Sequence, residues 1–194
     1  MRDKNKPTVY RVGYFGDGIY KANIKGVQTK RYKIWNSMLQ RCYDVKFQSR
    51  NPWYKDCKVD EKWHNYQNFA KWFEDNYIKG FELDKDLINK NNKIYSSINC
   101  SFIPKQINNL LIKRGKLRGI YPLGVTRLRD KFMSQLSVNG KLVKLGIFNS
   151  VEEAFKVYKK EKEQLIKKMA EEYKKDIPQI IYENLVNYKI TIND

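Results

Sequence analysis

Two kinds of hydrophobic pattern divide the first part of the chain. Apolar residues recur every three or four positions between residues 29 and 42, and an aromatic pattern of the same spacing covers residues 65–76. Both patterns predict amphipathic helices that pack against a core. Residues 9–21 instead alternate around Gly16-Asp17-Gly18, which predicts a small β-hairpin near the N-terminus.

The middle of the chain predicts a strand hairpin followed by a helix. Residues 81–84 form a first short strand, residues 100–103 form a second, and a polar loop rich in Asn and Lys joins them. Pro104 suits the first turn of a helix, because the N–H that it lacks would be unbonded there anyway. Asp84 on the first strand and Asn108 on the helix offer oxygen ligands for one hard divalent cation.

Beyond Pro122 the pattern becomes that of a sheet and a helix. The predicted strands are residues 123–127, 131–138 and 141–148. Asn139-Gly140 predicts a two-residue type I′ turn, and the capping box that starts at Ser150 opens a long helix. The predicted fold class of the whole chain is α+β: a strand hairpin and helix with helices before it, then a three-stranded antiparallel sheet packed on one helix.

These patterns divide the chain into four segments. They are residues 1–111, a basic linker at 112–121, a sheet-and-helix domain at 122–176 and a tail at 177–194. The linker combines glycines with Lys113, Arg114, Lys116 and Arg118, a composition typical of a flexible segment that lies along a DNA backbone.

Charge and cysteine content indicate the class of partner and the compartment. The 39 Lys and Arg exceed the 21 Asp and Glu, which gives a net charge of +18. This excess predicts a polyanionic partner, and double-stranded DNA is the first candidate. Three cysteines are too few for a four-cysteine zinc site and odd in number for a disulfide framework, so we expect reduced thiols in a cytoplasmic protein. No secretory signal or long apolar stretch is present, so we expect no membrane partner.

Residues 81–109 resemble the ββα-metal finger of HNH endonucleases, especially the phage-type homing enzymes. Their sequence is FELDKDLINKNNKIYSSINCSFIPKQINN. The resemblance implies that the catalytic residues are Asp84, Lys85, Asn99 and Asn108, and that Asp84 and Asn108 bind Mg²⁺ or Mn²⁺. The chain departs from the family at one position, because Lys85 stands where the family has its general-base His. A lysine between two aspartates is charged at neutral pH, so we expect Lys85 to donate protons and hold phosphate rather than to accept a proton.

The pattern GV…KF.SQLSVNGK…LGIFNSVEEAF..Y resembles the Apetala-type (ethylene-response-factor) DNA-binding domain, a module also found on phage HNH homing endonucleases. The resemblance covers about residues 119–173 and is most specific from Val138 to Tyr158. It implies that the outward face of the sheet enters the major groove. The matching DNA-binding positions are Thr126, Arg127, Arg129, Met133, Gln135, Ser137 and Lys144. Because this sheet has fewer arginines than the plant domains, a guanine-rich target is not expected.

Three functions fit these features. The first is a phage-encoded, metal-dependent endonuclease or nickase that cuts duplex DNA at a recognised site in a bacterial host, with a monomer favoured. The second is a DNA-binding protein with an inactive finger, such as a phage regulator or an inhibitor of a host system. The third is a basic binder of nucleic acid, including RNA, without sequence preference, which the two-module layout disfavours. Asp84, Asn99 and Asn108 favour the nuclease and Lys85 opposes it, which leaves the nuclease slightly ahead of the second function.

Overall fold

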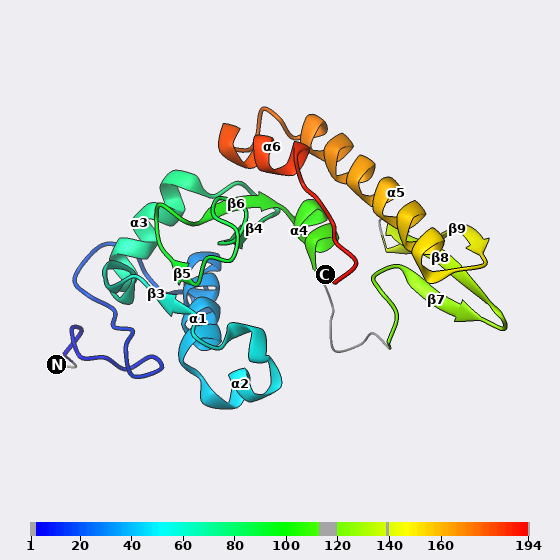
Figure 1. Cartoon of the computed structure of the whole chain (residues 1–194). Coiled ribbons are helices and arrows are strands. Elements are labelled where there is room, and N and C mark those ends of the chain that lie inside the picture. The colour runs from blue at the N-terminus through cyan, green and yellow to red at the C-terminus, as the bar shows by residue number, and fades with distance from the viewer. Residues whose placement is uncertain (1–2, 113–119, 139, 194) are drawn as a thin grey trace. The chain divides into compact units, whose positions relative to one another are not determined.

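The computed structural model describes residues 3–112, 120–138 and 140–193 (Figure 1). It confirms the mixed α+β class. The chain divides into two compact units, Met1–Ile103 and Pro104–Asp194, which are described separately below. This division falls within the predicted first segment of residues 1–111, and the assignment of that segment to an endonuclease domain stays a prediction.

Among its described residues, the first unit contains three α-helices and two 3₁₀ helices. They are α1 (Lys30–Tyr43), α2 (Val45–Arg50), α3 (Tyr66–Asn76), η1 (Pro52–Tyr54) and η2 (Glu61–His64). Side-chain caps begin both predicted helices: Thr29 accepts a hydrogen bond from the Tyr32 N–H at 3.4 Å, and Asn65 accepts one from the Gln67 N–H at 2.9 Å. The aromatic stripes of α1 and α3 lie in the core, where Trp35 and Tyr66 are fully buried.

The predicted N-terminal hairpin at residues 9–21 is wrong. The hairpin lies further along, between β1 (Asn23–Ile24) and β2 (Val27–Gln28), which pair antiparallel. Lys25 and Gly26 form its turn with φ of 48° and 80°, the left-handed conformation that a tight hairpin turn requires. The earlier segment makes only one tight turn, in which Val9 and Gly13 form an antiparallel bridge. Tyr14 then bonds to the start of α3: its N–H donates to the His64 carbonyl, and its carbonyl accepts the Tyr66 N–H.

Two small sheets complete the first unit. One joins β3 (Lys58–Val59) to β5 (Ile94–Tyr95) in parallel, and the other joins β4 (Phe81–Asp84) to β6 (Ser101–Pro104). The second sheet contains the two strands expected on either side of the polar loop. The loop itself is more ordered than its composition predicts, because β5 lies within it and is held against β3.

The second unit contains a three-stranded antiparallel sheet in the order β7-β8-β9. Its elements are α4 (Lys105–Leu111), β7 (Val125–Leu128), β8 (Lys131–Val138), β9 (Lys141–Phe148), α5 (Val151–Glu172) and α6 (Gln179–Val186). Helix α5 packs against all three strands (Figure 1). β8 and β9 occupy the predicted residues, whereas β7 begins at Val125 rather than at Leu123. Val138 pairs with Lys141, as a two-residue turn requires, although Asn139 lies outside the described residues.

A β-bulge interrupts β9. Gln135 pairs with Lys144 and Ser134 pairs with Gly146, so Leu145 is the extra residue on β9. A bulge inserts one residue and therefore shifts the alternation of side chains by one position. As a result, Ile147 lies on the same face of the sheet as Lys144.

The tail folds back along α5. Ile181, Leu185 and Ile190 are buried. Both backbone groups of Ile190 are bonded to α5: its N–H donates to Glu163 Oε1 at 2.8 Å, and its carbonyl accepts the Lys159 ammonium. The described tail residues therefore belong to the second unit.

Candidate functional site

Asp84 holds the start of the polar loop. It is the last residue of β4, and its Oδ1 accepts the N–H groups of Asp86 at 2.9 Å and Leu87 at 2.8 Å. Burial raises the pKa of the Asp84 carboxyl, although the two N–H groups act in the opposite direction. Since Oδ1 is engaged with the backbone, Oδ2 is the oxygen that a cation would have to reach.

Lys85 points into the loop rather than out to solvent. Its side chain is 9% exposed, and its ammonium bonds to Asp86 Oδ1 and, at 2.8 Å, to the carbonyl of Asn92. The Asn92 amide returns a bond of 2.9 Å to the Lys85 carbonyl. The ammonium also lies 5.8 Å from the centre of the Tyr95 ring. Its bonds close the loop, so the predicted role of Lys85 as a phosphate clamp is not supported by its position.

Asn99 also bonds within the loop. Its Oδ1 accepts a hydrogen bond of 2.8 Å from Asn89, and its Nδ2 donates to the Ile94 carbonyl at 3.5 Å. The three predicted residues Asp84, Lys85 and Asn99 therefore share one short segment and each stabilises its conformation.

The predicted metal ligands belong to different units. Asn108 lies on α4 and is partly buried, whereas Asp84 lies in the first unit. Within the described residues, no group of three or more His, Cys, Asp and Glu side chains could hold a metal ion. One aspartate and one asparagine would not form such a group, so the Mg²⁺ or Mn²⁺ site stays a prediction.

The three cysteines are buried and free in the first unit. Burial raises the pKa of Cys42 and of Cys100 to about 12 and also raises that of Cys57. Their thiols are therefore protonated at neutral pH, and a protonated thiol is a poor nucleophile and a poor metal ligand.

His64, the only histidine, has partners outside the predicted finger. Its Nε2 lies 3.1 Å from the hydroxyl of Tyr43, which also accepts the Val59 N–H at 3.0 Å. The imidazole thus links η2 to α1 and β3. This contact supports a structural role rather than one as a general base.

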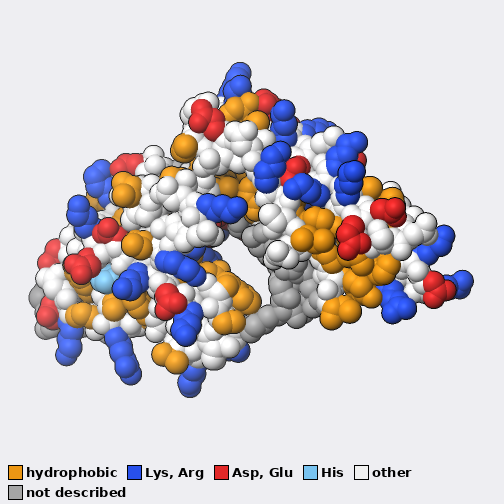
Figure 2. Space-filling view, in the orientation of Figure 1, with side chains coloured by type: hydrophobic (Ala, Val, Ile, Leu, Met, Phe, Trp, Pro, Cys, Tyr) orange, Lys and Arg blue, Asp and Glu red, His pale blue; other side chains and the backbone are white. Residues whose placement is uncertain are grey.

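Five of the predicted DNA-binding positions lie on one face of the second unit's sheet: Thr126, Met133, Gln135, Ser137 and Lys144. Thr126 lies opposite Met133, Gln135 lies opposite Lys144, and Ser137 lies opposite Leu142. The other face is covered by α5 and contains the buried residues Val125, Ser134 and Leu136. Figure 2 shows hydrophobic, basic and acidic side chains on the visible surface of this unit.

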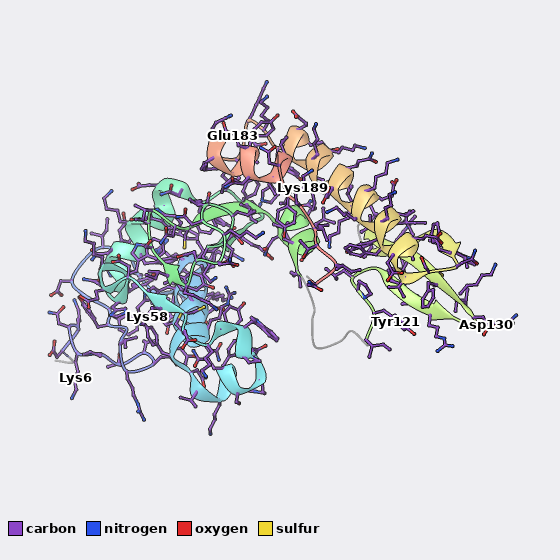
Figure 3. All side chains as sticks on the ribbon, viewed as in Figure 1. Lys6, Lys58, Tyr121, Asp130, Glu183 and Lys189 are labelled. Atoms are coloured by element: carbon purple, nitrogen blue, oxygen red, sulfur yellow. The ribbon has the colours of Figure 1, made fainter. Side chains whose placement is uncertain are left out.

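The two predicted arginines lie at the end of the β7–β8 hairpin rather than on this outward face. Arg129 and Asp130 form the turn, and Asp130 marks its tip in Figure 3. Arg127 lies opposite Phe132, on the α5 side of the sheet, and its Nε donates to the Arg129 carbonyl at 3.0 Å. Both arginines are exposed, which suits contacts with DNA phosphates rather than with base edges.

Several outward residues were not among the predicted positions. They are Leu128, Lys131, Leu142 and Ile147. Strict alternation along each strand identifies the first three, because they share parity with Thr126, Met133 and Lys144. Alternation does not identify Ile147, which faces outward only because of the bulge at Leu145.

A groove of about 950 Å³ lies within the second unit, between α4, β7, β8 and α5. Its buried cation is Lys162, whose ammonium donates to the Tyr158 hydroxyl at 2.8 Å. Gln106 and Asn109 contribute amides from α4. The lysine is thus held by its own helix.

The predicted linker cations Lys113, Arg114, Lys116 and Arg118 lie outside the described residues. In the described part of the chain, no helix has the length and apolar character needed to cross a bilayer. Comparison with family models, curated proteins and solved structures gave no match. The HNH and Apetala-type resemblances therefore stay predictions.

Proposed function

We propose that this chain is a DNA-binding protein that recognises a duplex site with the outward face of β7–β9. The observation that carries the proposal is the arrangement of Gln135 and Lys144 side by side on a face that α5 leaves uncovered. A two-stranded β-ribbon fits the major groove, and a net charge of +18 favours a polyanion. The arginines of the β7–β8 turn supply phosphate contacts beside this face.

The second candidate is the phage-type HNH endonuclease or nickase, with one divalent metal ion at the finger. The pairing of β4 with β6 and the position of α4 directly after β6 support it, because a ββα-metal finger is expected to have two paired strands followed by a helix; β5 lies between the two strands along the chain. We place it second because Asp84, Lys85 and Asn99 all bond within the loop, and because Lys85 replaces the family's base. In the preferred proposal the finger is a structural remnant, and the protein acts as a regulator or an inhibitor by occupying DNA.

Binding is tested by fluorescence anisotropy of the full chain with a labelled pool of random duplexes. Each neutralised phosphate should contribute about −0.9 to the slope of log affinity against log salt concentration. Sequential selection from the pool should enrich a shared sequence. A nearly flat salt dependence, or a selected pool with no shared sequence, would overturn the proposal.

Matched charge variants test which surface binds. Lys144 lies on the outward face of the sheet, whereas Lys160 is exposed on α5. Lys144→Ala should weaken binding to the selected duplex more than Lys160→Ala does, although both remove one positive charge. Equal losses would place the DNA elsewhere.

Cleavage is tested on supercoiled plasmid that contains the selected sequence, with Mg²⁺ and with Mn²⁺. The preferred proposal expects no nicking. Metal-dependent nicking by the purified wild type that Asp84→Ala abolishes, with DNA binding retained, would establish the second candidate instead. Lys85→His restores the family's imidazole, so a gain of nicking in this variant would indicate a true HNH finger.

A further inference from the structure

The outward face of the sheet is unusually apolar for a surface that meets DNA. Leu128, Leu142 and Ile147 are 40%, 66% and 43% exposed, and Met133 is partly exposed beside Ile147. All four lie on the side of the sheet opposite α5. Apolar side chains make no favourable contact with phosphate groups, so these residues should contact an apolar group of the ligand.

Gln135 lies among these residues. Its backbone N–H donates to the Gly124 carbonyl at 2.8 Å, so the sheet already satisfies that donor. Its side-chain amide, on the face opposite α5, has a donor and an acceptor next to each other. Adenine presents the complementary pair, N7 and N6–H₂, in the major groove, and glutamine is a usual partner for it.

Thymine supplies the matching apolar group. Its C5-methyl projects into the major groove, directly beside the adenine edge of the same base pair, and apolar side chains contact it there. Neither G·C nor an RNA pair has this methyl group.

We propose that the outward face of β7–β9 selects A·T base pairs, with Gln135 bonded to adenine and its apolar neighbours in contact with thymine methyl groups. This inference rests on the proposed function and specifies the bases that the sheet reads. Gln135 on β8 lies opposite Lys144 on β9, and Leu142 and Ile147 lie on either side of Lys144 on β9. The apolar side chains therefore flank the position opposite the amide. The recognised site therefore contains several A·T pairs in succession.

The charges of the face identify DNA as its occupant. Lys131 and Lys144 lie on the outward face, and the adjoining turn contains both Arg129 and Asp130. None of the outward positions of the three described strands is acidic. An apolar face with cations and no carboxylates complements a methyl-bearing groove between two rows of phosphates.

Replacement of thymidine by deoxyuridine tests the methyl contacts, because it removes the methyl group and leaves base pairing intact. The full chain is titrated with the duplex selected above and with copies that contain deoxyuridine at single positions. Each contacted methyl should contribute about fourfold in affinity, the value of one buried CH₂ group. Unchanged affinity at every substituted position would overturn the inference and leave the proposed function standing.

Adjacent residues of β9 give a matched pair of variants. Leu142 lies on the outward face, and Val143, which is 43% exposed, lies on the side that α5 covers. Leu142→Ser should weaken binding to the thymidine duplex severalfold and should be insensitive to deoxyuridine at the position that Leu142 contacts. Val143→Ser should bind both duplexes like the wild type.

Two further results would overturn the inference. If Leu142→Ser changes the sedimentation of the free protein and not its affinity for DNA, the apolar face belongs to a contact between copies of the chain. If Gln135→Ala leaves the selected sequence unchanged, the amide does not read adenine. Failure of the full chain to bind any duplex would instead remove the proposed function itself.

Discussion

Gly124 determines how β7 meets α5, and its replacement by alanine tests that packing. Gly124 has φ of 74°, and a Cβ added there would lie 1.9 Å from Cδ2 of Tyr158, well inside any real contact distance. The Tyr158 side chain cannot move away easily, because Tyr158 is buried and its hydroxyl accepts the Lys162 ammonium.

The expected cost of Gly124→Ala has two parts. Placing alanine in the left-handed region costs about 1–2 kcal/mol. Forcing a methyl group against a buried ring costs about 1–3 kcal/mol more. Gly140→Ala is the matched control, because Gly140 also has a positive φ of 78° but no described atom lies within 4 Å of its added Cβ. The control should therefore lose only the first part.

The two units can be monitored separately in one urea titration. All four tryptophans lie within residues 1–103, so their fluorescence reports on the first unit, whereas far-UV circular dichroism also reports α5. Gly124→Ala should shift the dichroism transition to lower urea concentration and leave the tryptophan transition in place. Equal shifts for Gly124→Ala and Gly140→Ala would refute the contact with Tyr158 as the cause.

Three further predictions concern the first unit. Lys85→Met removes the ammonium that bonds to Asp86, so the free energy of unfolding should fall by about 1.5–3 kcal/mol, measured by tryptophan fluorescence in urea; no change would show that the loop does not depend on this bond. Burial raises the pKa of Asp84 above its ordinary value of 3.8, so the folded protein holds this proton more tightly than the unfolded chain does. The resulting stability is present below pH 3.8 and is lost as the pH rises through the pKa of Asp84 in the folded protein. The free energy of unfolding of the wild type, relative to that of Asp84→Asn, should therefore fall over that range. A difference that does not change with pH would contradict the raised pKa of Asp84. Cys42 and Cys100 should react with a soluble thiol reagent only after unfolding, because burial raises both pKa values to about 12; rapid labelling of the native protein would show that they are accessible.

Local patterns in the sequence predicted α1, α3, α5 and the long strands well, whereas no pattern predicted α2. Thr29, Asn65 and Ser150 begin helices through their own side chains, so the signal lies within a few residues of the element it starts. β8 and β9 are long enough for alternation to define them. These features depend on neighbours in the chain, which a single sequence displays.

The conformation of the polar loop could not be predicted in the same way. β3 and β5 are two residues each, too short for any periodic signal, and they pair across a long stretch of chain. The ammonium of Lys85 bonds to a backbone carbonyl, that of Asn92, which no side-chain pattern reveals. The bonds of Asp84, Lys85 and Asn99 within the loop were therefore not foreseeable, and their catalytic roles stay predictions.

The bulge at Leu145 has a consequence for how this domain tolerates insertions and deletions. On β9, Leu142 and Lys144 face outward and Gly146 faces α5, so deletion of Leu145 would restore unbroken alternation and leave every other side chain on its present face. Deletion of Val143 instead would transfer Leu142 and the residues before it to the opposite face. Leu145 is therefore the position of β9 at which a change of length preserves the chemical identity of both faces, and related chains of different length should differ there.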